Sequence, residues 1–86
     1  MASQAMRLTA AQQSALITLG RCEDSGRMPV EGWRRKTDDR RVNTAAALSL
    51  YRLYLANWDF GFNARYRFYL TGAGRKIYDI LAGSGA

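Results

Sequence analysis

Three short stretches of the chain carry residue types that can do chemistry. Residues 72–74 read Gly-Ala-Gly and precede two cations, a composition found in loops that hold nucleotide phosphates. Asp38 and Asp39 are adjacent carboxylates, the residue type that serves acid–base catalysis or binds a metal ion. Residues 34–44 are rich in arginine and polar side chains, which suits contact with a nucleic acid. The spacing of these residues decides whether the sequence is more typical of an enzyme or of a binding protein.

The glycine stretch matches neither common nucleotide-binding motif. A dinucleotide-binding fingerprint needs a third glycine three residues after Gly74, and Ile77 occupies that position. A P-loop needs a glycine five residues before a Gly-Lys-Ser or Gly-Lys-Thr sequence, which the chain lacks. We expect the glycines to permit close approach of the backbone and Thr71 to cap a last helix. The free N–H groups at that helix start can still meet a backbone phosphate.

Catalysis and metal binding find little support in the rest of the chain. Neighbouring carboxylates do not share a helix face, so we expect Asp38 and Asp39 to cap the helix that follows. The sequence has no histidine and a single cysteine, Cys22. The usual zinc ligands and the general base of a Ser–His or Cys–His pair are therefore missing. We expect no enzymatic activity, no metal and no cofactor.

Length and charge indicate one small domain with a polyanionic partner. The chain has 86 residues, of which we expect 8–82 to fold and 1–7 and 83–86 to be flexible. Thirteen cations against seven anions give a net charge of +6, which attracts nucleic acid or an anionic membrane face. No apolar run approaches the roughly 20 residues of a membrane helix. We expect a cytoplasmic protein, or one in the host cell if a phage encodes it.

The first half of the chain is predicted to form two helices. Thr9 and Gln12 have the spacing of a capping box at the start of the first helix, and Gly20 predicts its end. Residues 21–27 are then a polar surface loop with solvated carboxylates. Pro29 suits the first turn of a second, short helix because its missing N–H needs no partner there.

The second half is predicted to contain a long helix, a hairpin and a last helix. Nothing interrupts residues 40–55, where helix propensity is high. Apolar and polar residues then alternate over 56–60 and again over 65–70, which predicts two antiparallel strands. A last helix follows Thr71. Its apolar face is predicted to consist of Ile77, Ile80 and Leu81.

This order of elements resembles a winged helix-turn-helix domain over residues 8–81. The most specific stretch is 69–75, YLTGAGR, which is similar to the LT-x-x-G-R ending of the wing in MarR-type and PadR-type bacterial regulators. Two features depart from that pattern. Residues 48–56 lack the glycine at the exit from the recognition helix, and the long outer dimerisation helices are missing. The resemblance implies a mainly helical α+β fold with three helices, a two-stranded wing and a C-terminal helix.

The resemblance implies a small transcriptional regulator of bacterial, plasmid or phage type that binds double-stranded DNA sequence-specifically. The helix at about 40–55 would lie in the major groove, and the wing at 56–70 would lie on the backbone or the minor groove. The expected base contacts are Arg40, Arg41, Asn43 and Thr44. The expected phosphate contacts are Arg34, Arg35, Lys36 and Thr71, and the expected wing contacts are Asn63, Arg65 and Arg67.

Other partners stay open on the sequence alone. The same fold can serve as a protein-interaction or assembly module, or bind RNA. Phe62 and Tyr69, aromatic residues near cations, would also suit stacking on single-stranded bases. A homodimer on a palindromic site is compatible with the surplus of apolar residues, because one such module buries only about 600–1,000 Å² of surface. No membrane partner is expected.

Overall fold

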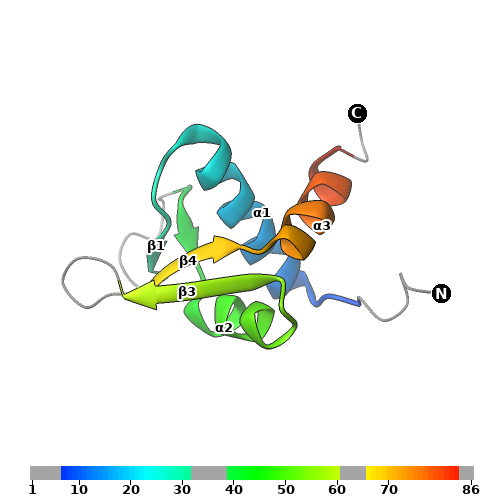
Figure 1. The fold of residues 1–86 in the computed structure, drawn as a ribbon, viewed down its shortest axis with the longest axis horizontal. Coiled ribbons are helices and arrows are strands. Elements are labelled where there is room, and N and C mark those ends of the chain that lie inside the picture. Colours follow the sequence, from blue (N-terminus) through cyan, green and yellow to red (C-terminus); the bar gives the residue numbers. More distant parts are fainter. Residues whose placement is uncertain (1–6, 32–38, 61–65, 84–86) are drawn as a thin grey trace.

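The structure, a computed structural model, describes residues 7–31, 39–60 and 66–83. Strand β1 pairs in parallel with β2, and β3 pairs antiparallel with β4 (Figure 1). The result is a small, mainly helical α+β domain, as the sequence predicts, with three helices among the described residues where the sequence predicts four. The elements in chain order are α1 (Ala10–Ser25), β1 (Val30–Glu31), β2 (Arg41–Val42), α2 (Thr44–Arg52), β3 (Ala56–Phe60), β4 (Tyr66–Leu70) and α3 (Gly72–Gly83).

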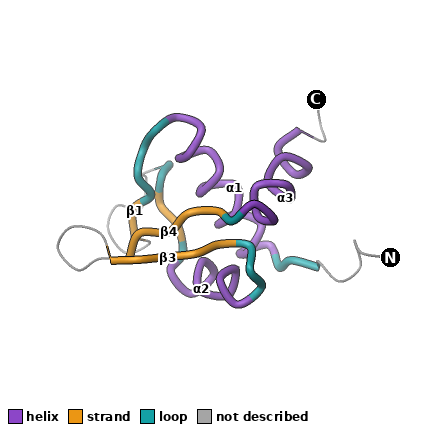
Figure 2. Tube along the Cα trace, in the orientation of Figure 1, coloured by secondary structure: helices purple, strands orange, loops and turns teal. Residues whose placement is uncertain are grey.

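Helix α1 lies at the centre of the fold and packs against α2, α3, β2 and β4 (Figure 2). Four leucines from α1, α2 and the turn after α2 are fully buried, and each contributes about 1.5–3 kcal/mol of burial. They hold α2 against α1 and against the inner face of the hairpin. None of the described helices is long and apolar enough to cross a bilayer. The four leucines are Leu16, Leu19, Leu50 and Leu55.

Helix α1 begins where the sequence predicts and ends later. Thr9 and Gln12 form the expected capping box, with N–H to side-chain distances of 2.9 and 3.1 Å. The predicted end at Gly20 is wrong, because the left-handed cap is Gly26, with φ 68°. Gly20 is a glycine for another reason. A Cβ atom there would lie 2.3 Å from the Tyr78 ring, so its absence lets α3 approach α1.

The segment after α1 contains two short strands where a short helix was predicted. Val30 is the first residue of β1, and its N–H donates to the Arg40 carbonyl at 2.9 Å. Two-residue strands are too short to show a periodic pattern, so they could not be predicted from the sequence. The predicted short helix is therefore wrong at Val30 and Glu31, which form β1. Trp33 and the rest of 32–38 lie outside the described residues.

Helix α2 is shorter than the predicted helix at 40–55. Asn43 is its N-cap, and the Asn43 Oδ1 atom accepts from the Ala46 N–H at 3.1 Å. Arg40 and Arg41 therefore precede the helix, because the backbone at Arg41 pairs with β1. The helix ends at Arg52. Extended backbone at Asn43 makes it the cap, in place of the expected Asp38 and Asp39.

The hairpin and the start of α3 agree with the sequence. Its register pairs Ala56 with Leu70 at the inner end and Phe60 with Tyr66 at the outer end. The Thr71 hydroxyl accepts from the Gly74 N–H at 3.1 Å and so caps α3 as expected. The face of α3 agrees with the prediction in part, because Ile77 and Leu81 pack against the core beside the buried Tyr78. Ile80, expected on the buried face, is 62% exposed.

Tyr54, in the turn after α2, has a left-handed backbone, with φ 62°. A left-handed conformation costs a non-glycine residue about 1–2 kcal/mol. We expect Tyr54→Gly to raise the free energy of unfolding by about 1 kcal/mol and to raise the Tm, because the entropy of glycine offsets part of the gain. Tyr54→Ala keeps the strain while removing the ring, so thermal unfolding of the two variants separates the causes. Equal stabilisation by both would contradict a backbone origin.

Candidate nucleic-acid interface

The structure places the predicted base-contact residues side by side. Arg40 and Arg41 lie at the start of β2, Asn43 caps α2 and Thr44 is its first residue. Thr71 and Arg67, which are also expected to contact DNA, bind other groups of the protein. The Thr71 hydroxyl donates to the Tyr54 carbonyl at 2.6 Å. The Arg67 guanidinium forms a bidentate pair with the Asp59 carboxylate at 2.8 and 2.7 Å. The predicted contacts Arg34, Arg35, Lys36, Asn63 and Arg65 lie outside the described residues.

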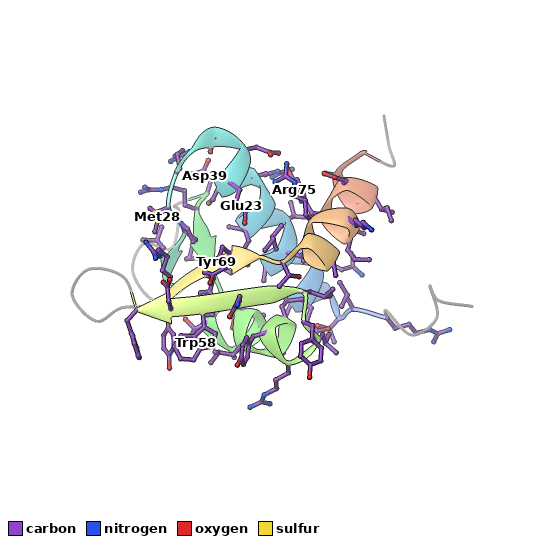
Figure 3. All side chains as sticks on the ribbon, in the orientation of Figure 1. Glu23, Met28, Asp39, Trp58, Tyr69 and Arg75 are labelled. Carbon is purple, nitrogen blue, oxygen red and sulfur yellow. The ribbon has the colours of Figure 1, made fainter. Side chains whose placement is uncertain are left out.

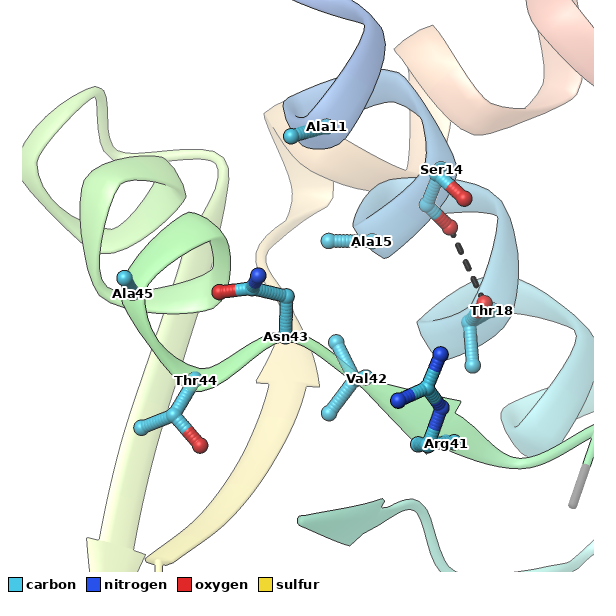
Figure 4. A pocket seen from close by; sticks show the side chains of 9 residues that line it. All are labelled: Ala11, Ser14, Ala15, Thr18, Arg41, Val42, Asn43, Thr44 and Ala45. Carbon is cyan, nitrogen blue, oxygen red and sulfur yellow. Dashed lines mark hydrogen bonds between the residues drawn. The ribbon is translucent and has the colours of Figure 1, made fainter. Parts of the chain in front are cut away.

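A cleft of about 520 Å³ separates α1 from the start of α2 (Figure 4). Ser14 and Thr18 of α1 lie on one side, and the Thr18 hydroxyl donates to the Ser14 carbonyl at 2.9 Å. The other side carries Asn43 and Arg41 (Figure 4). Small side chains on both sides leave the cleft open to a ligand. Its lining residues are Ala11, Ser14, Ala15, Thr18, Arg41, Val42, Asn43, Thr44 and Ala45.

A second cleft, of about 220 Å³, follows further along α1. Its lining residues are Arg21, Cys22, Ser25, Arg27, Asp39 and Arg40. One face of α1 borders both clefts, because positions 14, 18, 21 and 25 have the spacing of a single helix face. The neighbours across from it, positions 40 and 41, are consecutive. We call the two clefts together the basic groove.

The basic groove concentrates positive charge. Among the residues that the structure describes, its lining includes four arginines and one carboxylate, Asp39. Asp39 lies 3.3 Å from Arg27, but both side chains are exposed, and such a pair is worth about 0–1 kcal/mol. A groove with one sign of charge focuses the field and raises the local concentration of anions. The four arginines are Arg21, Arg27, Arg40 and Arg41.

Sequence reasoning missed the contribution of α1 to this groove. Ending the first helix at Gly20 placed Arg21 and Ser25 in a loop and interrupted the row that begins at Ser14. The signal was nevertheless present, because Ser14, Thr18, Arg21 and Ser25 repeat at helical spacing through Gly20.

Helix α2 adds an exposed face without acids. Residues 40–58 contain three arginines and no carboxylate. The core side of α2 consists of Ala46, Ala47 and Leu50. Helical geometry puts Ala45 and Arg52 on the opposite side, and both are exposed. A small residue near the helix start and a cation near its end allow close approach to a polyanion.

Three carboxylates gather instead around Arg75, beside α1 and α3 (Figure 3). Glu23 lies 3.5 Å from Arg75, and its Oε2 atom also accepts from the Leu70 N–H at 2.6 Å. Asp24 accepts from Arg75 and from the Tyr78 hydroxyl, the latter at 2.9 Å. The expectation that Glu23 and Asp24 lie on a solvated loop is therefore wrong, because both end a helix and bind distant residues. This network ties α1 to β4 and α3.

The same network predicts loss of stability in both acid and alkali. The hydrogen bond from Arg75, then that from Tyr78, lowers the pKa of Asp24 below its usual 3.8. The stabilisation is therefore present above that pH and is lost as the pH falls through the lowered pKa. Burial, then the bond to Asp24, raises the pKa of Tyr78 above its usual 10.0. That stabilisation is present below about pH 10 and is lost as the pH rises through the raised pKa.

Thermal unfolding between about pH 2 and pH 11 measures how the Tm falls in acid, which we call the acid limb, and in alkali, which we call the alkaline limb. Asp24→Asn should weaken the acid limb without abolishing it, since the hydrogen bond from Arg67 also lowers the pKa of Asp59. Tyr78→Phe should weaken the alkaline limb and leave the Asp59 part of the acid limb intact. Unchanged limbs in both variants would assign the pH dependence to other groups.

Comparison of the chain with protein-family models, with curated proteins and with solved structures finds no match.

Proposed function

We propose that this protein binds double-stranded DNA through the basic groove and the exposed face of α2. The observation that carries the proposal is the first cleft. Arg41, Asn43 and Thr44, three of the four residues expected to contact bases, line it together with Ser14 and Thr18. Arginine and asparagine read guanine and adenine edges, and small hydroxyl side chains bind phosphate oxygens.

The dimensions of α2 suit the major groove. An α-helix with its side chains is about 10–12 Å in diameter, and the major groove is about 12 Å wide. The start of α2 faces the cleft, so its free N–H groups and its dipole favour a phosphate there. Arg21 and Arg40 in the second cleft would follow the same phosphate strand along α1.

Within this proposal the domain acts as a winged helix, with α2 as the recognition helix and β3–β4 as the wing. The protein would regulate transcription by occupying its site, as bacterial, plasmid or phage regulators of this type do. Arg67 would have to exchange Asp59 for a phosphate.

A titration of labelled random-sequence duplex at 50 mM salt tests the proposal. Non-specific binding with a Kd of about 10 µM or lower is expected, because non-specific affinities reach about 10⁻⁴–10⁻⁶ M even at physiological salt. Selection of bound sequences then gives the preferred site. No binding to duplex at 50 mM salt would overturn the proposal. If RNA competed more strongly than duplex DNA, the interface would be assigned to RNA. If the protein bound another protein but no DNA, the interface would be assigned to protein interaction.

Sequence discrimination separates base contacts from phosphate contacts. Arg41→Ala should reduce the preference for the selected site over random duplex, since a good bidentate contact supplies about 1–3 kcal/mol of discrimination. Asn43→Ser should do the same while its hydroxyl keeps the helix cap, which Asn43→Ala would remove. Arg67→Ala should weaken all duplexes alike. If Arg41→Ala and Arg67→Ala changed the preference for the selected site equally, the assignment of base contacts to the start of α2 would be wrong.

A further inference from the structure

The inner face of the hairpin carries a ladder of three nearly parallel rings. Tyr66 stacks on Phe68 with ring centroids 5.6 Å apart and planes 18° apart. Phe60 lies 5.8 Å from Tyr66, with planes 31° apart. The ladder runs out of the core, because Phe68 is 4% exposed, Tyr66 36% and Phe60 62%. Phe60 is thus its exposed end.

Other rings hold this ladder in place and connect it to α2. Trp58 lies edge-on to Phe60 at 5.4 Å and to Tyr66 at 5.0 Å. Tyr51 of α2 meets Trp58 at 6.1 Å. Figure 3 shows Trp58 on the side of β3 that faces α2. The exposed rings therefore form a fixed surface beside the helix that we assign to DNA.

The charges around this surface favour a nucleic acid over a second copy of the chain. Residues 40–58, which supply Tyr51 and Trp58, contain no carboxylate. The strand register puts Asp59 and Arg67 on the opposite face of the hairpin, where they pair with each other. A second copy would bring another net charge of +6 against the same surface, whereas a phosphate chain is attracted by it.

We propose that the hairpin stacks an unpaired nucleobase on Phe60, so that the protein prefers duplex DNA that adjoins a single strand. The inference rests on the proposed function and extends it to a substrate class. Every base has a π-face, so such a contact adds affinity without demanding a particular sequence. The base continues the ladder of Phe68, Tyr66 and Phe60, while α2 and the basic groove hold the adjoining duplex.

Fluorescence anisotropy with three labelled DNAs tests this inference. The first is a blunt duplex, the second carries a single-stranded extension of six thymidines, and the third carries six abasic nucleotides instead. Both 5′ and 3′ extensions are measured. The thymidine extension should bind at least about 5-fold more tightly than the abasic one, because stacking on an aromatic side chain is worth a factor of about 5–150 per base. The abasic extension controls for the added phosphates.

Phe60→Leu should remove the advantage of thymidine over abasic nucleotides and leave blunt-duplex binding unchanged. Phe60→Tyr should keep the advantage. Ile80→Ala, at an equally exposed apolar residue of α3, controls for loss of surface hydrophobicity. Equal affinity of the wild-type protein for the two extensions would overturn the inference. Weaker binding of the blunt duplex by Phe60→Leu would also overturn the inference, because Phe60 would then contact duplex DNA. A change in the sedimentation of the Phe60→Leu variant without DNA would overturn it too, because Phe60 would then belong to a self-association surface.

Failure of the proposed function gives a different result. In that case the wild-type protein binds none of the three DNAs at 50 mM salt. Binding of the blunt duplex with no difference between extensions keeps the proposed function and rejects only the stacking of a base.

Discussion

Gly74→Ala is expected to lower the free energy of unfolding by about 3 kcal/mol or more. A Cβ atom at Gly74 would lie 1.7 Å from the Leu55 carbonyl oxygen and 2.7 Å from its carbon. These are backbone atoms, so no side-chain rotation relieves the clash, and overpacking typically costs about 1–3 kcal/mol even where side chains can move. The Leu55 carbonyl is also fixed, because it accepts from the Thr71 N–H at 3.1 Å.

The only relief is movement of α3, which has its own cost. Shifting the helix would loosen the Tyr78 ring from Gly20 and the Tyr78 hydroxyl from Asp24. Because a domain of 86 residues has a total stability of roughly 4–13 kcal/mol, the variant should be close to unfolding at 37 °C.

Urea denaturation followed by far-UV circular dichroism measures the loss, and Gly72→Ala is the matched control. The same substitution two residues earlier meets nothing within 4 Å, so it should leave the stability unchanged or slightly higher. Equal midpoints for the two variants would show that α3 does not pack against the turn at Leu55.

Local signals were read correctly from the sequence. Alternation with period two predicted the hairpin, and Thr71 predicted the start of α3, because strand period and helix caps are decided by a few neighbouring residues. The glycine stretch was read as a site of close backbone approach, and Gly74 against Leu55 confirms this. The fold class followed from the same elements. The winged-helix arrangement and its function stay predictions.

Distant contacts decided what the sequence did not predict. Gly20 has the local features of a helix end, but Tyr78, 58 residues later, explains why a glycine stands inside α1. The pairing of Val30 with Arg41 likewise depends on residues that are far apart in the chain. In the candidate interface, the predicted arginines around β2 were placed together, whereas the face of α1 opposite them was missed. A helix that runs on through Gly20 supplies that face.

The affinity for duplex DNA is expected to fall about 500-fold between 50 and 200 mM salt. About five phosphate contacts per protomer give a slope of roughly −4 to −5 in log K against log salt, since each neutralised phosphate contributes about −0.9. The second cleft supplies three of the cations, Arg52 at the end of α2 supplies a fourth, and Arg67 of the hairpin supplies a fifth. A protein that recognises another protein through this face would show a much flatter dependence.

The double variant Arg21→Gln with Arg52→Gln removes one cation from the second cleft and one from the end of α2. It should reduce the slope by about 2 and lower the affinity at 50 mM salt by about 10- to 100-fold. Lys76→Gln removes a cation from α3, which packs mainly on α1 and β4, so it should leave the slope nearly unchanged. If Lys76→Gln flattened the salt dependence as much per charge as the double variant does, only the net charge would matter. The groove would then not be the binding site, because a net charge of +6 attracts DNA wherever the cations lie on the surface.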